Sequence, residues 1–153
     1  MKSADSPRSQ TGDDSSQKNP QPAPKKILVA DDLAMNRELM REVLESSGYV
    51  VVEARDGSEA IREAYGGRPD LILLDIDMPV LNGYAVARRL RQDKDFLEVP
   101  IIAVTGLSSR EDRERAYDAG CNSFLRKPFN LSNLKDEIEC FLGVSSTRGR
   151  VRA

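Results

Sequence analysis

The 153-residue chain contains no histidine, no tryptophan and only two cysteines. Without histidine it cannot build a Ser-His or Cys-His pair, bind a metal through imidazole, or carry a phosphohistidine of its own. Cys121 and Cys140 are far apart in the sequence and form no CxxC pair. The prediction for both is a small buried side chain in a reducing compartment. Any chemistry of this chain must therefore use carboxylates, lysine, hydroxyls and the backbone.

Long apolar runs and a marked excess of either charge are also absent. No apolar run approaches the roughly 18 residues of a membrane span, and no apolar segment follows the first charged residues, which argues against a secretory signal. The net charge of −2 and the pI near 5.3 give no electrostatic footprint for nucleic acid. We therefore expect a cytoplasmic protein that does not span a membrane and does not bind nucleic acid.

The length and the 39% of hydrophobic residues suit one domain between two polar segments. Residues 1–25 are rich in Ser, Gln, Pro and Asp, and are predicted to be a disordered tail or linker. Residues 144–153 are polar and carry several arginines, and are predicted to be a flexible tail. The folded domain is expected over residues 26–143. With no output domain expected on either side of it, the output should be contact with another protein, unless the chain is a fragment of a longer protein.

Between these two segments, short apolar runs alternate with stretches of helical periodicity. Strands are predicted at 27–30, 49–52, 71–74, 101–104 and 123–125, and helices at 35–47, 58–65, 83–92, 108–120 and 131–142. Ser108 and Glu111 predict a capping box at the start of the fourth helix. The pair Gly66-Gly67 predicts the end of the second helix. The alternation predicts an α/β fold with a single doubly wound five-stranded parallel sheet.

Polar side chains follow four of the predicted strands, namely Asp31-Asp32, Asp75, Thr105 and Lys127-Pro128. A parallel sheet gathers such strand ends at one edge, where open α/β sheets bind their ligands. Three carboxylates close together need a cation, and all-oxygen ligands suit a hard ion such as Mg²⁺, with Mn²⁺ as an alternative. A carboxylate can also act as a nucleophile and form an acyl phosphate. The lysine and the hydroxyl would then contact the phosphoryl oxygens.

Each of these residues also has an ordinary structural interpretation. The two adjacent acids could cap the following helix, and Asp75 could be a turn residue before Met78-Pro79. Thr105 could simply end a strand, and Lys127 could be a surface lysine. Because the ordinary interpretation would have to hold at four strand ends at once, we favour a functional site.

Five segments, in this order, resemble the CheY-like receiver domain of two-component response regulators. They are ILVADD at 27–32, LLDIDMP at 73–79, NG at 82–83, PIIAVTG at 100–106 and FLRKPF at 124–129. The resemblance covers roughly residues 26–143 and implies a flavodoxin-like (βα)5 fold with strand order 2-1-3-4-5. It also implies a histidine kinase or a histidine phosphotransfer domain as phosphodonor, and a downstream target protein that the sequence does not identify.

The same resemblance assigns roles to the acidic residues. It implies that Asp75 is the phosphoacceptor and that Asp31 and Asp32 are the acidic pair. Asp32 would then bind the metal directly and Asp31 through water, and Asp75 and the backbone carbonyl of Asp77 would be further ligands. The side chain of Asp77 departs from many receivers, which have other residue types there. Our hypothesis is that this second carboxylate tunes the phosphoryl lifetime by positioning or repelling water.

The resemblance implies that Thr105 and Lys127 contact the phosphoryl group, and the Lys127-Pro128 bond is similar to one that is usually cis in the family. The implied switch moves the Thr105 hydroxyl toward the phosphoryl group and turns the aromatic Phe124 inward. The surface of the fourth helix, fifth strand and fifth helix then changes. A core aromatic that never moves is the alternative for Phe124.

The leading prediction is a signalling switch, which is not an enzyme beyond catalysing its own phosphorylation and slow dephosphorylation. One alternative is a small phosphohydrolase of the haloacid dehalogenase type, with Asp75 as nucleophile and Asp77 as general acid. Against it, Asp75 follows the third strand rather than the first, and the chain has no room for a cap domain. The other alternative is a receiver-like interaction module that is not phosphorylated.

Overall fold

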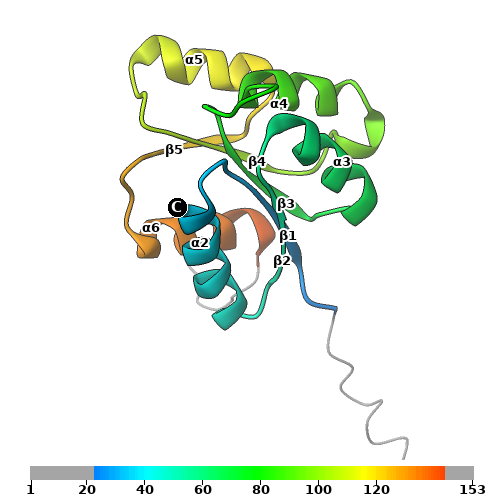
Figure 1. Ribbon diagram of the computed structural model, residues 1–153, viewed down its shortest axis with the longest axis vertical. Helices are drawn as coiled ribbons and strands as arrows, with labels where there is room; N and C mark the ends of the chain where they lie inside the picture. The colour runs from blue at the N-terminus through cyan, green and yellow to red at the C-terminus, as the bar shows by residue number, and fades with distance from the viewer. Residues whose placement is uncertain (1–22, 144–153) are drawn as a thin grey trace, which may run out of the picture.

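The computed structural model describes residues 23–143, so the predicted tails lie outside the described residues except for positions 23–25. Within this part, five parallel strands form one sheet in the order β2-β1-β3-β4-β5 (Figure 1). They are β1 (Lys26–Ala30), β2 (Val50–Ala54), β3 (Leu71–Asp75), β4 (Ile101–Thr105) and β5 (Ser123–Arg126). The predicted fold class and strand order are confirmed.

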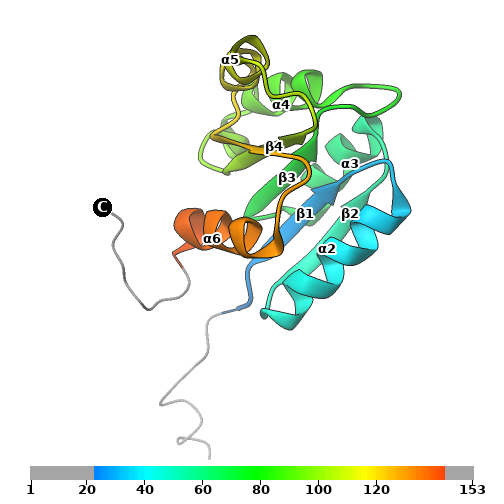
Figure 2. The same cartoon turned by 90° about the vertical axis from the view of Figure 1, so that its left-hand side faces the viewer.

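Within residues 23–143, four α-helices and one short 3-10 helix lie between the strands, and a fifth α-helix follows β5. They are α2 (Ala34–Ser46), α3 (Gly57–Gly67), α4 (Gly83–Arg91), η2 (Lys94–Phe96), α5 (Arg110–Ala119) and α6 (Leu131–Leu142). Helices α2 and α6 cover one face of the sheet, and α3, α4 and α5 cover the other (Figure 2). Across residues 23–143, no helix combines the length and the apolar character that crossing a membrane requires.

Two hydrophobic cores lie on the two faces of the sheet. Because successive side chains of a strand point to opposite faces, neighbouring residues of β3 divide between them: Ile72 packs toward α3, α4 and α5, and Leu73 packs toward α2 and α6. Every residue of β3 and β4 is buried, as expected for central strands of a sheet covered on both faces. These continuous apolar runs are the reason that the sequence located both strands.

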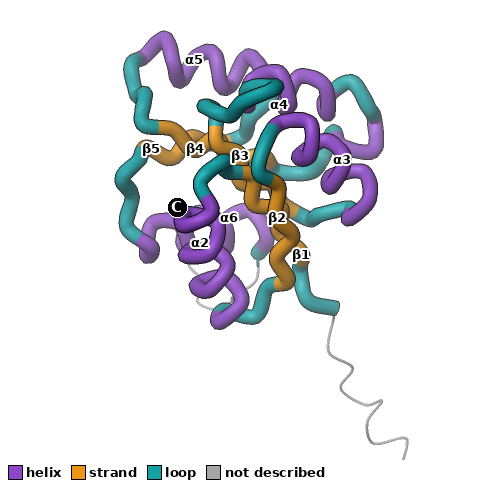
Figure 3. The backbone as a smooth tube through the Cα atoms, in the orientation of Figure 1, coloured by secondary structure: helices purple, strands orange, loops and turns teal. Residues whose placement is uncertain are grey.

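The connections leave β1 and β3 toward opposite faces of the sheet. Strand β1 pairs with β2 on one side and with β3 on the other. The chain passes from β1 into α2 on one face and from β3 into α4 on the opposite face (Figure 3). A reversal of this kind leaves a crevice beyond the carboxyl ends of the two strands, where ligands bind in such sheets.

Some predicted element ends are wrong. Helix α5 begins at Arg110, and its cap is Ser109, one residue later than the predicted cap Ser108. The Ser109 hydroxyl accepts from the Asp112 backbone N–H at 3.0 Å, and the Asp112 carboxylate accepts from the Ser109 N–H at 3.1 Å. Both Ser108 and Ser109 are followed three residues later by an acid. The sequence pattern therefore fits two registers equally well.

Three other predictions need correction. Strand β2 begins at Val50 rather than at residue 49. Helix α3 includes Gly66 and ends at Gly67, and the following residue, Arg68, caps it in a left-handed conformation with φ of 48°. Cys121 is buried as predicted, but Cys140 on α6 is exposed. Spacing along the sequence did not show that Cys140 lies on the solvent side of its helix.

Candidate functional site

Three carboxylates meet in the crevice beyond β1 and β3. Asp31 directly follows β1, and its backbone N–H still pairs with the carbonyl of Ala54 on β2 at 3.0 Å. Asp75 is the last residue of β3. One carboxylate oxygen from each of Asp31, Asp32 and Asp75 lies within 4.8 Å of the other two. Asp31 and Asp75 are only 1% and 3% exposed, whereas Asp32 is open to solvent.

Lys127 and Thr105 complete the polar edge from β5 and β4. The Lys127 ammonium lies 3.3 Å from Oδ2 of Asp75 and 3.5 Å from Oδ2 of Asp31. The side chain of Thr105 is fully buried, and the carbonyl of this residue accepts from the Lys127 backbone N–H at 2.8 Å. The peptide bond between Lys127 and Pro128 is cis. The structure thus brings together residues from four strand ends.

Burial controls the electrostatics of the site. It raises the pKa of the Asp75 carboxyl from 3.8 to about 6, against the lowering effect of Lys127 and with the support of the Asp31 carboxylate. Burial also acts to lower the pKa of Lys127, but the Asp75 and Asp31 carboxylates outweigh it and raise that pKa. One ammonium therefore faces more negative charge than it can balance, which favours the binding of a further cation.

The start of α4 packs against the backbone of Asp75. The Gly83 N–H donates to the Ile76 carbonyl at 2.9 Å. A Cβ atom at Gly83 would lie 2.6 Å from the Asp75 carbonyl oxygen and 2.8 Å from Ile76 Cα, so only glycine fits there. The backbone N–H of Asp77 donates to Oδ1 of Asp75 at 3.1 Å. These contacts hold the Asp75 carboxylate in one orientation.

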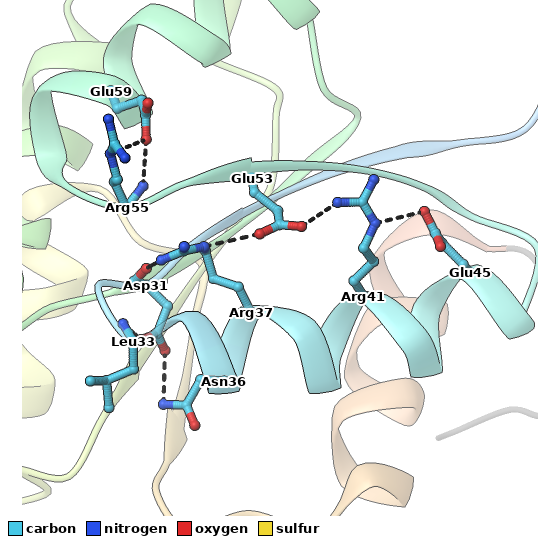
Figure 4. Close-up of polar contacts among 9 residues, drawn as sticks. All are labelled: Asp31, Leu33, Asn36, Arg37, Arg41, Glu45, Glu53, Arg55 and Glu59. Carbon is cyan, nitrogen blue, oxygen red and sulfur yellow. Dashed lines mark hydrogen bonds and ion pairs between the residues drawn. The ribbon is translucent and has the colours of Figure 1, made fainter.

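Helix α2 holds Asp31 through three donors. The backbone N–H of Leu33 donates to Oδ1 at 2.9 Å, and the Asn36 amide donates to Oδ2 at 3.3 Å (Figure 4). The Arg37 guanidinium donates to the backbone carbonyl of Asp31 at 2.7 Å. Leu33 is the N-cap residue and has no side-chain cap bond, so the interpretation of the acid pair as the cap of this helix is wrong.

Asn36 and Arg37 contact the site but were not predicted from the sequence as site residues. Both lie in the first turns of the helix that starts directly after the acid pair. Side chains of a helix tilt toward its N-terminus, so polar residues in these turns are directed back toward the preceding strand end. The signal available in the sequence was therefore the presence of polar residues in the first turns after the acid pair.

The donor set fits a divalent cation of the Mg²⁺ type. Three carboxylate oxygens can converge on one ion, and oxygen is the ligand atom that hard cations prefer. One exposed acid, Asp32, leaves the site open to water, which suits an ion that keeps several of its waters. The residues present therefore fit the metal that the sequence predicted.

Comparison with known proteins identifies the family. The family model described as "Response regulator receiver domain" matches residues 27–139. The chain belongs to the response regulator receiver family. A relative is the polar-differentiation response regulator DivK of Brucella anthropi, 36% identical over 120 residues, which are 78% of this chain and 98% of DivK.

Solved receiver structures agree with this assignment. The chemotaxis protein CheY4 of Vibrio cholerae superimposes with a TM-score of 0.75 at 31% identity, covering 78% of this chain and 99% of CheY4. The receiver domain of a sensor histidine kinase from Pseudomonas aeruginosa has a TM-score of 0.73 at 37% identity, covering 79% and 99% of the two chains. That structure is described with a magnesium ion coordinated in its active site cleft.

This receiver is therefore a component of two-component signalling, and receivers act as signalling switches. The family match gives no support to the phosphohydrolase alternative. The alternative would need the acceptor at the end of the first strand. In the structure, Asp75 instead ends β3, the central strand of the sheet.

The receiver places Phe124 on the same side of the sheet as Thr105. Phe124 on β5 pairs with Ala103 on β4, two residues before Thr105. Paired residues of parallel strands, and residues two apart on one strand, project to the same face. Phe124 is partly buried and packs against the core beneath α3, α4 and α5. The two residues therefore share one face of the sheet.

Proposed function

We propose that this receiver accepts a phosphoryl group on Asp75 in the cytoplasm. The donor is the phosphohistidine of a histidine kinase or of a histidine phosphotransfer domain. The observation that carries the proposal is the cluster of three carboxylates with a lysine ammonium 3.3 Å from Asp75. A carboxylate that two hydrogen bonds hold in place, beside a lysine ammonium, is suited to act as a nucleophile.

The carboxylates also provide the metal site. Asp31, Asp32, Asp75 and the backbone carbonyl of Asp77 would hold Mg²⁺, with Asp32 as a direct ligand and Asp31 acting through water, as the family resemblance implies. Mn²⁺ can replace Mg²⁺ at such an all-oxygen site. The bound ion supplies positive charge beside the oxygens of the phosphoryl group during transfer. It also relieves the repulsion between the crowded carboxylates.

The transfer step forms one bond and breaks one. A carboxylate oxygen of Asp75 attacks phosphorus, and the bond between phosphorus and the histidine nitrogen of the donor breaks. The imidazole leaves with that electron pair and takes a proton from solvent. The Lys127 ammonium and the Thr105 hydroxyl contact the phosphoryl oxygens. Positioning and positive charge account for most of the catalysis in this class of reaction.

The donor docks on the outer face of α2. Leu33, Met35 and Leu39 there are 55%, 77% and 49% exposed. Leu39 borders a groove of about 540 Å³ that Asp31 and Lys127 also line. Because this groove reaches Lys127, whose ammonium lies 3.3 Å from Asp75, the occupant is a helix of the donor adjacent to its phosphohistidine. Apolar side chains of that helix then cover Leu33 and Met35.

The output surface consists of α5, β5 and α6. On phosphorylation the Thr105 hydroxyl moves toward the phosphoryl group, and Phe124 follows into the space beneath α5. The surface of these three elements then changes and is recognised by a downstream protein. A small electrostatic event thereby shifts the balance between two packing arrangements.

Intact mass after incubation with Mg²⁺ and a small-molecule phosphodonor tests the proposal. We expect a gain of one phosphoryl group per chain in the wild type and none in Asp75→Asn. Steady release of phosphate from an ester substrate would contradict it. So would a phosphoryl gain of equal size in Asp75→Asn, which would place the acceptor elsewhere.

Decay of the acyl phosphate tests the separate role of the Asp77 side chain. Asp77 is exposed next to the acceptor, where its carboxylate can position or repel water. We expect Asp77→Asn to change the decay rate, with Asp95→Asn, an exposed acid of η2, as the control. Equal decay rates in wild type and Asp77→Asn would remove this role.

A further inference from the structure

Arg37 links the metal site to the edge strand β2. Its Nη1 donates to the Asp31 carbonyl at 2.7 Å, and its Nε donates to Oε1 of Glu53 on β2 at 3.0 Å (Figure 4). The side chain is only 15% exposed, so it lies against the protein. We propose that Arg37 is a positioning residue that orients the Asp31-Asp32 peptide for Mg²⁺ binding. This inference rests on the metal site of the proposed function.

The Asp31-Asp32 peptide is the point where orientation matters most. The peptide group is planar, so the direction of the Asp31 carbonyl sets the direction of the Asp32 N–H and the position of the Asp32 Cα atom. The Asp31 side chain is already held by Leu33, Asn36 and Lys127. Asp32 lies beyond the sheet and is exposed. Holding the Asp31 carbonyl therefore constrains the one acid of the cluster that the sheet does not.

The fork of the guanidinium explains how one side chain can do this. Arg37 reaches its two acceptors with different nitrogens of one planar group. Glu53 is itself held by Arg41, which in turn contacts Glu45 at 3.0 Å. The Glu53 carboxylate is thus a fixed anchor on β2 against which Arg37 can hold the carbonyl. Lysine in place of Arg37 could donate to either acceptor but could not bridge them with the same planar geometry.

The charge of Arg37 predicts an effect of the opposite sign. A cation close to a metal site repels the metal, so removing that charge should strengthen Mg²⁺ binding. If Arg37 positions the peptide, removing it should weaken Mg²⁺ binding. The sign of the change in affinity therefore separates positioning from simple electrostatics.

Arg41 offers a matched control within the same network. It carries the same charge, lies one turn further along α2 and contacts the same Glu53. Its other contact among the described residues is Glu45, on the side away from the metal site (Figure 4). A change that results only from loosening Glu53 or from losing one positive charge will appear in Arg41→Gln as well.

Calorimetric titration of the full chain with Mg²⁺ alone tests the proposal. We expect Arg37→Gln to bind Mg²⁺ about 10-fold or more weakly, the range found when groups that orient metal ligands are removed. Arg37→Lys should lie between Arg37→Gln and wild type, and Arg41→Gln should stay within about twofold of wild type. Urea unfolding verifies that each variant is folded at the titration temperature. If Arg37→Gln does not fold, Arg37→Lys carries the comparison.

Backbone amide NMR in the absence of Mg²⁺ gives a second readout. The Asp32 amide resonance should shift in Arg37→Gln and stay in place in Arg41→Gln, because only the first contact reaches the Asp31-Asp32 peptide. Wild type that binds Mg²⁺ tightly, together with Asp32→Asn that does not bind it, supports the metal site. If Arg37→Gln then binds Mg²⁺ as tightly as wild type or more tightly, only the positioning role is overturned. Absence of Mg²⁺ binding in wild type overturns the proposed metal site and the positioning role together.

Discussion

At the carboxyl ends of β1 and β3, the protein buries the carboxylates of Asp31 and Asp75 beside one another, whereas near the start of β4 and β5 it partly buries the guanidinium of Arg91. The Arg91 nitrogens donate to Gly120 O at 2.9 Å, to Val99 O at 2.8 Å and to the Phe96 carbonyl. A further bond at 2.7 Å reaches the Asn122 side chain. The guanidinium thus finds fixed acceptors in two segments, residues 96–99 and 120–122.

The difference lies in how the buried charge is matched. Burial lowers the pKa of Arg91, but a guanidinium stays protonated at neutral pH, and its acceptors come from within the protein. Burial raises the pKa of Asp75 to about 6, and its partners leave the acid cluster short of positive charge. The hydrogen-bond acceptors of the Arg91 guanidinium all come from the protein itself. The negative charge of the acid cluster is not balanced by the protein, which favours a cation from solution.

The largest predicted effect is at the Arg91 end. Arg91→Ala removes the donor for four acceptors and leaves the Gly120 and Val99 carbonyls without that partner. A buried acceptor left without a partner costs about 1–3 kcal/mol, so two of them cost roughly 2–6 kcal/mol. We expect urea unfolding at neutral pH to show a loss in this range. Arg89→Ala is the control, because Arg89 is exposed on the same helix, and it should change stability by no more than about 0.5 kcal/mol.

At the acidic end the prediction has the opposite sign. The pKa of Asp75 is raised from 3.8 to about 6 in the folded protein. Ionising it therefore destabilises the metal-free fold by up to about 3 kcal/mol, at about 1.4 kcal/mol for each pKa unit. Asp75→Asn removes this burden, so the metal-free variant should be more stable than wild type at pH 7 by up to this amount. Urea unfolding in the presence of a chelator measures the difference.

The contribution of Asp75 to stability should depend on pH because its pKa is raised in the folded protein. Between about pH 4 and pH 6 the folded protein holds a proton on Asp75 that the unfolded chain releases, so this group favours folding more as pH falls. The advantage of Asp75→Asn should therefore be largest above about pH 7 and vanish below about pH 4. Mg²⁺ should stabilise wild type far more than Asp75→Asn. An advantage independent of pH would contradict the assignment.

Two glycines near the site give the smallest predicted effect. A Cβ atom in Gly83→Ala would collide with the backbone of Asp75 and Ile76, whereas a Cβ atom at Gly106 has no heavy atom within 4 Å. Overpacking of this kind costs about 1–3 kcal/mol, so Gly83→Ala should lose about 2 kcal/mol in urea unfolding. Gly106→Ala should be close to neutral. Comparable losses in the two variants would show that the start of α4 does not pack against the acceptor strand.

The sequence alone was sufficient for the fold because its signals are local. The continuous apolar runs of β3 and β4 and the alternation of strand and helix patterns predicted a doubly wound parallel sheet. The N-caps Asn82 and Asn130 illustrate this local range, because each accepts a bond from the first turn of its own helix, at 3.0 and 2.7 Å. The register of the α5 cap was missed because neighbouring serines offer equivalent local choices.

The candidate site was predicted in part for the same reason. Asp31, Asp75 and Thr105 stand where apolar runs stop, and a parallel sheet brings such positions to one edge. Arg37 and Glu53 carried no comparable signal, since they are 16 residues apart and belong to different elements. Arg91 was missed likewise, because its partners at Gly120 and Asn122 are 29 and 31 residues away.

By itself, then, the order of apolar and polar residues determined the sheet, its helices and the set of chemical groups at one edge. Only the tertiary structure decided that Lys127 faces both Asp31 and Asp75, that the pKa of Asp75 rises to about 6, and that Arg37 holds a carbonyl of the acid pair. The physical reason is range. Propensity and periodicity act over a few neighbouring residues, whereas burial and charge pairing depend on which distant segments packing brings together.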